Sequence, residues 1–293
     1  MEKYIDLHVH TKASDGSMTP SQVVRYAAKD HLAAIAITDH DTIDGVKEAV
    51  AEGERYDVEV VPGIEIGVEF EVELHILGYY IDIKSKTLND TLNQLQCFRQ
   101  ERNPQIVKKL NALGFAMNMA DVSAKAEGSV VGRPHIAAVM LEKGYINNMD
   151  EAFEKYLGKG KCAYVDKKRL TPAEGIRLIK EAGGLAVLAH PVYLEQHKID
   201  LEALVKQLMR YGLSGIEGYY PDHSKETHEK YLALARKHHL LVTGGSDFHG
   251  SHKLDIKLGK GYGDLKVPYD LLTALKQASK DNRLQSKKNG SHF

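Results

Sequence analysis

The chain has little of several residue types, and each shortage excludes a class of protein. It contains no tryptophan and only two cysteines, Cys97 and Cys162, which form no Cys-x-x-Cys pair. Two isolated cysteines exclude a disulfide framework and indicate free thiols in a reducing compartment. No apolar run approaches the length of a membrane span, and no signal-peptide pattern opens the sequence. We therefore expect a soluble cytoplasmic protein.

An excess of either charge is also missing. The 39 Lys and Arg residues oppose 40 Asp and Glu residues, which gives a formal net charge of −1. Proteins that bind long nucleic acid make many phosphate contacts through a broad basic surface. The balance therefore argues against a protein that binds long nucleic acid, and it leaves room for a local basic pocket. We also expect no membrane and no obligate protein partner. The 293 residues, 43% of them apolar, suffice for one large domain or a domain with an insertion.

Short apolar runs alternate with amphipathic helical patterns along most of the chain. Strands this apolar, separated by helices, indicate parallel strands that are buried on both faces, in an α/β barrel or an open sheet. Thr19 and Thr171 each precede a proline and have Gln or Glu three residues later, which predicts two capping boxes, and Asp200 can cap a helix over 201–211. The seven expected strands, which favour closure into a barrel, are residues 4–9, 33–38, 58–66, 73–80, 185–190, 214–220 and 240–245.

The alternation stops between residues 83 and 165, where the pattern is helical and highly charged. We interpret this stretch as a small helical insertion domain that acts as a lid. The expected domains are a first barrel segment at 1–82, the insertion at 83–165, a second barrel segment at 166–279 and a frayed polar tail at 280–293.

Histidines and carboxylates gather where the predicted strands end. In α/β barrels the carboxyl ends of the strands form one mouth, where the active site is built. One buried histidine is usually a satisfied core residue, but nine polar side chains at equivalent positions would leave an apolar mouth with too many desolvated groups. Imidazole and carboxylate are ligands of Zn²⁺, Mn²⁺ and Fe, and nine of them suit two or three ions. The predicted metal ligands are His8, His10, Asp15, His40, Glu65, His75, His190, Asp247 and His249.

Six motifs carry a family resemblance: DLHVHTKASDG, AITDHDT, PGIEI, LHILGY, LAHP and GGSDFHG. In order and spacing they resemble the PHP (polymerase and histidinol phosphatase) family over residues 1–80 and 183–250. The helical insertion, GRPHIA (132–137) and GIEGYYPDHS (215–224) are most similar to the nucleotide-bisphosphate phosphatase branch, which is also described as a 5′-to-3′ exoribonuclease on short RNAs. The resemblance implies a distorted seven-stranded (β/α) barrel with a trinuclear metal centre.

The resemblance also implies an assignment of the ligands, with Mn²⁺ as the expected ion and Fe²⁺ or Zn²⁺ as alternatives. Asp15 stands where histidinol-phosphate phosphatases have a histidine, so the third site departs from the family pattern in affinity and metal preference. The first ion would be held by His8, His10, Glu65 and Asp247, the second by Glu65, His75 and His190, and the third by Asp15, His40 and His249.

Three further residues are candidates for contact with the substrate. Arg133 begins a predicted insertion helix, where a guanidinium and free backbone N–H groups favour an anion, so we expect it to bind phosphate together with His135. Read alone, Arg133 could equally be a surface arginine of the lid. His223 lies in a Pro-Asp-His-Ser loop and is expected to bind a phosphate or to protonate the leaving group; a solvated loop histidine is the alternative.

The carboxylates beside the ligands leave two interpretations open. Asp6, Asp39 and Asp41 adjoin predicted ligands, and they could orient imidazoles or cap strand ends.

Together these features predict a metal-dependent phosphoesterase that hydrolyses the 3′-phosphate of nucleoside 3′,5′-bisphosphates and also short 5′-phosphorylated RNA. In this hypothesis a hydroxide between the ions bound through Glu65 attacks phosphorus, Arg133 balances charge and His223 is the acid. Three alternatives stay open: another phosphatase, such as one for histidinol phosphate; an amidohydrolase, although Glu65 stands where its carbamate lysine is usually found; and a non-catalytic PHP module.

Overall fold

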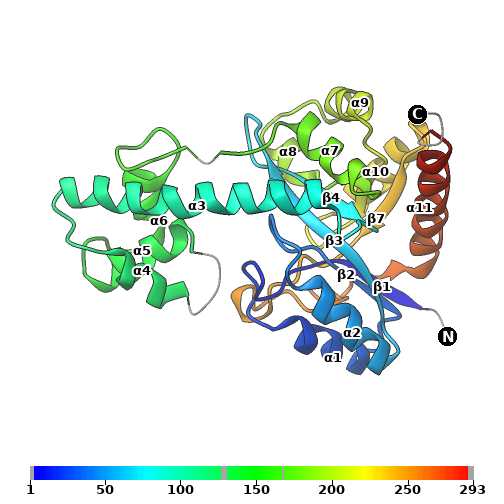
Figure 1. Ribbon diagram of the computed structural model, residues 1–293, viewed down its shortest axis with the longest axis horizontal. Coiled ribbons are helices and arrows are strands. Elements are labelled where there is room, and N and C mark those ends of the chain that lie inside the picture. The colour runs from blue at the N-terminus through cyan, green and yellow to red at the C-terminus, as the bar shows by residue number, and fades with distance from the viewer. Residues whose placement is uncertain (1–2, 127–130, 167, 290–293) are drawn as a thin grey trace. The chain divides into compact units, whose positions relative to one another are not determined.

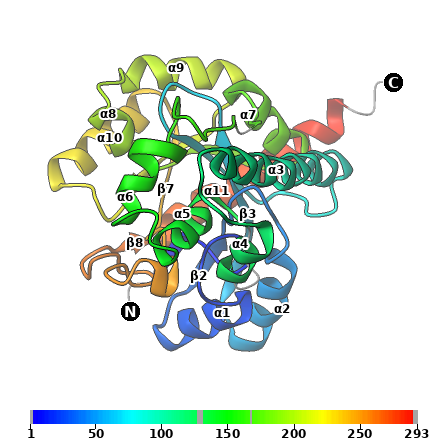
Figure 2. The same cartoon turned by 90° about the vertical axis from the view of Figure 1, so that its left-hand side faces the viewer.

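The centre of the protein is one mixed sheet, seen in a computed structural model that describes residues 3–126, 131–166 and 168–289 (Figures 1 and 2). The strand order is β7-β6-β5-β4-β3-β2-β1-β8. All seven predicted strands form, and β8, with only two residues, is too short for an apolar pattern to reveal. The strands are β1 (Tyr4–Val9), β2 (Ala34–Ile37), β3 (Glu59–Val68), β4 (Leu74–Tyr79), β5 (Leu185–Leu188), β6 (Gly215–Tyr219), β7 (Leu241–Gly244) and β8 (Val267–Pro268).

The sheet curls until β1 meets the segment that follows β7. Val9 forms an isolated parallel bridge with Phe248, and the N–H of His10 donates to the carbonyl of Phe248 at 2.9 Å. These contacts make the sheet a nearly closed barrel, as the sequence predicts, although with eight strands instead of seven. They also place the ends of β1 and β7 next to each other.

Strand β4 runs against both of its neighbours, so the sheet is not wholly parallel as the apolar pattern suggests. Residues 69–73 between β3 and β4 are too few for a parallel crossover, and they therefore make a hairpin. In this hairpin Gly67 pairs with His75. The reversal brings the start of β4, instead of its end, to the edge where β3 ends.

Helices cover the barrel, and their predicted starts are confirmed. Thr19 and Thr171 form capping boxes with Gln22 and Glu174, and the Asp200 carboxylate accepts from the N–H of Ala203 at 3.0 Å. These helices are α1 (Pro20–Lys29), α2 (Val46–Tyr56), α7 (Pro172–Glu181), α8 (Val192–Gln196), α9 (Leu201–Tyr211), α10 (Lys225–Lys237) and α11 (Tyr269–Asn289), with a 3₁₀ turn η2 (Gly250–His252).

One end of the barrel is closed by α11. Its Leu272 and Leu275 share an apolar cluster with Ile5 and Leu7 of β1. The helix continues to Asn289, so the frayed tail predicted from residue 280 is wrong for most of its length: this polar stretch holds good helix formers and no glycine before residue 290. The polar residues of the barrel therefore gather at the opposite end.

A second compact unit spans residues 91–169, whereas residues 1–90 and 170–293 form the barrel unit. The insertion was expected at 83–165; the first residues of α3 belong to the barrel unit, where Leu88 is fully buried. The helical unit has its own apolar core, which includes Ile106 and Ile136. Its helices are α3 (Lys86–Ala112), α4 (Met119–Ala126), α5 (Arg133–Glu142), α6 (Met149–Ala152) and a π-helix η1 (Phe153–Leu157).

No helix within the described ranges is both long and apolar enough to cross a lipid bilayer. Cys97 and Cys162 are both free and exposed.

Candidate metal centre

The nine predicted ligands come from six strands or the turns beside them, and the structure brings them to the open end of the barrel. His8 is on β1 and His10 follows it, Glu65 is on β3, and His75 is at the start of β4. His190 lies two residues after the end of β5 and Asp247 three residues after the end of β7, with left-handed φ angles of 26° and 55°. Non-glycine residues adopt such φ values at a cost in free energy, and they concentrate at functional sites.

The first group of ligand atoms surrounds one oxygen of Glu65. Its Oε2 lies 3.4 Å from His8 Nε2 and 3.2 Å from His10 Nε2. Asp247 Oδ1 lies 3.6 Å and 3.2 Å from the same two nitrogens. Ligand bonds of about 2.0–2.2 Å in a tetrahedral site separate neighbouring donor atoms by about 3.3–3.6 Å. Four pairs of donor atoms therefore have the spacing of ligands to one ion, and His8, His10 and Glu65 form a group that could hold a metal ion.

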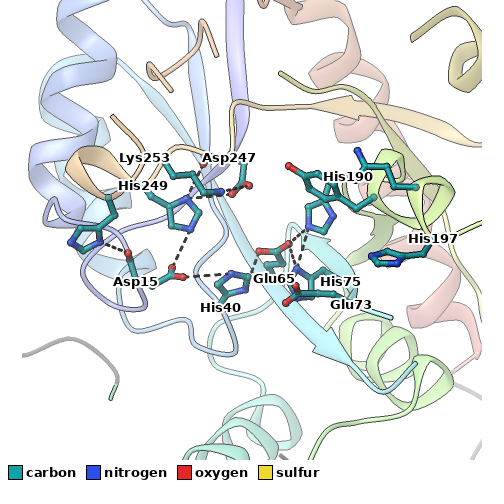
Figure 3. A pocket seen from close by; sticks show the side chains of 13 residues that line it. Asp15, His40, Glu65, Glu73, His75, His190, His197, Asp247, His249 and Lys253 are labelled. Carbon is teal, nitrogen blue, oxygen red and sulfur yellow. Dashed lines mark hydrogen bonds and ion pairs between the residues drawn. The ribbon is translucent and has the colours of Figure 1, made fainter. Parts of the chain in front are cut away.

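The second group surrounds the other oxygen of Glu65. Its Oε1 lies 2.9 Å from His75 Nδ1 and 3.0 Å from His190 Nε2, and these two nitrogens are 3.2 Å apart. Three donor atoms in one small triangle suit a second ion (Figure 3). Glu65 is thus placed to bridge two ions.

The third group surrounds Asp15, whose side chain is half exposed. Its oxygens lie 3.3 Å from His249 Nε2, 3.5 Å from His10 Nδ1 and 3.7 Å from His40 Nε2. His40 also contacts the first group, because its Nδ1 is 3.0 Å from Glu65 Oε2. The geometry thus adds His10 to the predicted third set and connects all three groups.

The hydrogen bonding of the buried ring nitrogens indicates whether the site suits metal ions. His8 Nε2 and both ring nitrogens of His10 are buried and make no hydrogen bond within the described part of the chain. A neutral imidazole has one N–H, yet both nitrogens of His10 face carboxylate oxygens. Unpaired imidazole lone pairs beside buried carboxylates are a donor set that divalent transition ions satisfy.

Electrostatics agree with a site built around positive charge. Burial alone would raise the pKa of Glu65, yet the imidazoles of His40, His75 and His8 hold it well below its usual value. Burial lowers the pKa of His75, but the carboxylates of Glu65 and Glu73 outweigh burial and raise it to about 10. Burial is the largest influence on His40 and lowers its pKa to about 4. The buried carboxylates therefore remain ionised and draw cations.

Glu217, on β6, is a functional residue that sequence reasoning missed. It is fully buried, and its two oxygens contact His8 Nδ1 at 3.0 Å and the N–H of His190 at 2.7 Å. By accepting the Nδ1–H of His8, it directs the lone pair of Nε2 towards Glu65 and Asp247. The signal was one carboxylate inside an otherwise apolar strand.

Tyr220 and Lys253 were also missed, and both act on Asp247. Its Oδ2 accepts from the Tyr220 hydroxyl at 2.8 Å and from Lys253 Nζ at 2.7 Å. Burial raises the pKa of Tyr220, so this hydroxyl stays protonated and donates. Asp247 Oδ1 is thereby left to face His8 and His10.

Asp6 and Asp39 support loops instead of imidazoles. Asp6 accepts from the backbone N–H groups of Ser246 and Gly259, at 2.9 and 2.7 Å. Asp39 accepts from the Thr11 backbone and side chain, both at 2.7 Å. Of the two interpretations that the sequence leaves open, the contacts of these two residues favour loop support.

A cavity of about 520 Å³ opens over the ligands (Figure 3). Its wall also includes Tyr193, Gln196, His197, His252 and Lys253, which are donors that the ligand assignment does not use. The cavity therefore offers hydrogen-bond donors and a cation beside the ligands.

The three predicted substrate residues have other contacts. In the helical unit, the Arg133 guanidinium donates to the carbonyl of Leu157 at 2.9 Å, and His135 Nδ1 accepts from the N–H of Gly132 at 2.9 Å. His223 Nδ1 donates to the carbonyl of Gly218 at 3.0 Å, and its ring packs against Tyr231 instead of lining the cavity. Its ring centroid lies 5.5 Å from that of Tyr220, and its role as a phosphate ligand or as the acid stays a prediction. The phosphate-binding roles of Arg133 and His135 stay predictions.

The sequence matches the family model for the PHP domain over residues 6–245. It is 35% identical to the 5′-3′ exoribonuclease Rnm of Escherichia coli, over 83% of this chain and 84% of the relative. It is 33% identical to the 3′,5′-nucleoside bisphosphate phosphatase of Chromobacterium violaceum (84% and 87% covered). It is also 33% identical to a phosphoribosyl 1,2-cyclic phosphate 1,2-diphosphodiesterase of Eggerthella lenta (84% and 94% covered).

The fold resembles the crystal structure of a presumed metal-dependent phosphoesterase from Bifidobacterium adolescentis. The TM-score is 0.78 at 29% identity, with 93% of this chain and 95% of the other covered. Strand arrangement, ligand geometry and relatives thus agree: the chain belongs to the PHP domain family and is a metal-dependent phosphoesterase.

Proposed function

We propose that this enzyme removes the 3′-phosphate from nucleoside 3′,5′-bisphosphates, with two to three divalent transition ions at the mouth of the barrel. The observation that carries the proposal is the arrangement around Glu65, whose two oxygens each face a separate group of nitrogens. Mn²⁺ is the expected ion, with Fe²⁺ or Zn²⁺ as alternatives, because the ligands are imidazoles and carboxylates without thiolate.

Divalent ions held there would supply an activated water and positive charge against the phosphoryl oxygens. The side chains fix where those ions sit. Glu217 sets the ring orientation of His8, and Tyr220 with Lys253 occupies one oxygen of Asp247 so that the other faces the site. Such supporting contacts commonly change metal affinity or activity by about 10–100-fold when they are removed.

The cavity supports a small phosphorylated substrate. Its volume of about 520 Å³ lies within the usual range of small-molecule sites, roughly 300–1,000 Å³. Lys253 offers a cation at the rim, where a phosphoryl oxygen can share the ammonium with Asp247. Arg133 and His135 of the helical unit are proposed as additional phosphate ligands. A substrate with two phosphates uses these cations, because one phosphate is held while the other is cleaved.

Two relatives support a nucleotide substrate, since one is named a nucleoside bisphosphate phosphatase and the other an exoribonuclease. The second favours a further candidate activity, the trimming of 5′-phosphorylated RNA a few residues long. The formal charge of −1 argues against long RNA, whose binding depends on many phosphate contacts.

The test compares kcat/KM for adenosine 3′,5′-bisphosphate with the values for 3′-AMP, 5′-AMP, histidinol phosphate and a 5′-phosphorylated trinucleotide. We expect the bisphosphate to be preferred, with AMP and inorganic phosphate as products. Removal of the 5′-phosphate should reduce kcat/KM by more than about tenfold, which corresponds to about 1.4 kcal/mol. A preference for histidinol phosphate, or a smaller loss, would contradict the two-phosphate proposal.

A further inference from the structure

A second hollow, of about 240 Å³, adjoins the metal cavity. The two share Tyr193, Asp247 and Lys253, all in the barrel unit. A ligand whose phosphate lies beside Lys253 therefore has a neighbouring space for the rest of its structure.

The outer wall of this hollow carries two exposed apolar side chains. Leu254 is 82% exposed and Tyr262 is 55% exposed, and both line the hollow together with Tyr193. Single exposed apolar residues are common, but two of them beside a metal centre form a surface that an aromatic ligand can cover. Neither side chain has a role in the core that would explain its place.

Tyr262 is held in position by its neighbours. It lies between Gly261 and Gly263, whose φ angles of +52° and +131° side chains rarely adopt, and Lys257 pairs with Gly261. Its hydroxyl donates to Asp222 Oδ1 at 2.8 Å. The glycine-rich segment LGKGYGD, which has no part in metal binding, thus fixes the direction in which this ring points.

A chain of hydrogen bonds connects this wall to the metal centre. Asp222 Oδ2 accepts from the Tyr193 hydroxyl at 2.5 Å, and that hydroxyl lies 3.2 Å from the Tyr220 hydroxyl. Tyr220 donates in turn to Asp247 at 2.8 Å. The apolar wall and the expected metal ligand are therefore parts of one connected arrangement.

We infer that this hollow is a nucleobase subsite, in which the base of the substrate packs against Tyr262 and Leu254 while its phosphate lies at the metal cavity. The inference rests on the proposed function and adds to it the residues that recognise the base. The exposed carboxylate of Asp222 accepts a hydrogen bond from an amino group of the base or from a ribose hydroxyl.

Charge and size favour a base over other occupants. Asp222 and Asp255 line the hollow, and their carboxylates repel a second phosphate. Among the described residues that line its wall, Lys253 is the only cation, at the boundary with the metal cavity. A hollow of about 240 Å³ takes one base, not a peptide. Stacking of one base on an aromatic side chain stabilises binding by about 1–3 kcal/mol, which is about 5- to 150-fold.

The experiment uses the full-length metal-loaded enzyme and two substrates, adenosine 3′,5′-bisphosphate and its base-free analogue 1-deoxyribose 3,5-bisphosphate. The readout is the ratio of their kcat/KM values. We expect the wild-type ratio to exceed about tenfold and to fall at least fivefold in Tyr262→Ala and Leu254→Ala, mainly through KM. Tyr262→Phe, which keeps the ring, should retain most of the ratio. Tyr56→Ala, an exposed tyrosine of α2 outside the hollow, should keep the wild-type ratio.

The base can belong to a mononucleotide or to a short RNA, and a 5′-phosphorylated trinucleotide distinguishes these sources. A lower kcat/KM in Tyr262→Ala with either substrate supports the subsite. The substrate with the larger loss shows whether the base belongs to a mononucleotide or to a short RNA. Equal wild-type hydrolysis with and without the base, or a ratio that Tyr262→Ala leaves unchanged, would overturn it. If neither bisphosphate is hydrolysed, the proposed function fails. The subsite is then tested by calorimetry, which compares the Kd of AMP with the Kd of ribose 5-phosphate in wild type and in Tyr262→Ala. A ratio of these Kd values that Tyr262→Ala leaves unchanged would overturn the subsite.

Discussion

At the scale of single residues, the two oxygens of Glu65 face different groups of imidazole nitrogens. One faces His8 and His10, and the other faces His75 and His190, all within 3.4 Å. Asp15 serves one group only, and its side chain is 51% exposed, so water can replace it. The two carboxylates should therefore differ in how much of the centre depends on them.

We predict that Glu65→Gln binds less than one equivalent of metal and loses activity by at least about 100-fold, because an amide cannot bridge two cations with two anionic oxygens. Asp15→Ala should keep about two equivalents, since only the third group loses a ligand. Elemental analysis after reconstitution with Mn²⁺, together with kcat, measures both effects. Equal metal content in the two variants would contradict the bridging role of Glu65.

That the nine predicted ligand side chains meet at one end of the barrel could be predicted, because imidazoles and carboxylates at strand ends are visible in a sequence. Their role as metal ligands stays a prediction. The residues that support them could not be predicted. Lys253, directly after the turn η2, and Tyr220, directly after β6, both donate to Asp247. No sequence pattern predicts either hydrogen bond. The hydrogen bond from His223 Nδ1 to the carbonyl of Gly218 could not be predicted for the same reason, because a loop sequence does not give the direction of a ring.

At the scale of elements, capped helices hold the strands that carry the ligands. Asp200 caps α9, whose buried face includes Leu204 and Leu208. The cap satisfies one backbone N–H that the helix leaves without a partner. Its contribution should be to stability alone, because α9 carries none of the nine predicted ligands.

We predict that Asp200→Ala lowers the free energy of unfolding by about 1 kcal/mol, because the N–H of Ala203 loses its acceptor. Asp200→Asn keeps an oxygen at the cap and should recover most of this loss. Urea unfolding measures the difference, and metal content serves as the control that should not change. A destabilisation equal in both variants would show that the charge, not the cap, matters.

The presence of the strands could be predicted from the sequence, but their direction in the sheet could not. The apolar runs of β1 to β7 mark the strands, but a hydrophobic pattern reads the same in both directions. The short link of residues 69–73 was the available sign that β4 returns beside β3. That reversal explains why His75 serves the site from the start of its strand while its partners do so near strand ends.

At the scale of the whole molecule, the cations proposed to bind phosphate belong to different units. Lys253 is in the barrel unit and Arg133 in the helical unit. Arg133 has contacts within its own unit: Leu157 accepts its hydrogen bond, and the rings of Phe153 and Tyr164 lie 5.7 Å away. The sequence alone could not separate a phosphate ligand from such a structural arginine.

We predict that Arg133→Ala leaves metal content intact and raises KM for adenosine 3′,5′-bisphosphate at least fivefold more than KM for 4-nitrophenyl phosphate, which has no second phosphate. Lys253→Met should reduce kcat/KM for both substrates, because the ammonium contacts Asp247 directly. Lys260→Met, whose ammonium pairs with Asp30, is the matched control. An equal change of both KM values in Arg133→Ala would assign this arginine a structural role, and circular dichroism monitors folding.

The contact between Val9 and Phe248 sets an order of events during protein synthesis. The ribosome makes His8 and His10 about 240 residues before Asp247 and His249. Until then the barrel cannot close, and the first group of ligand atoms lacks the carboxylate of Asp247. The core of the helical unit is contiguous in sequence and can form while translation continues. Completion of the first group is therefore a late step, and a chain that stops before Asp247 should contain a folded helical unit and an incomplete metal site.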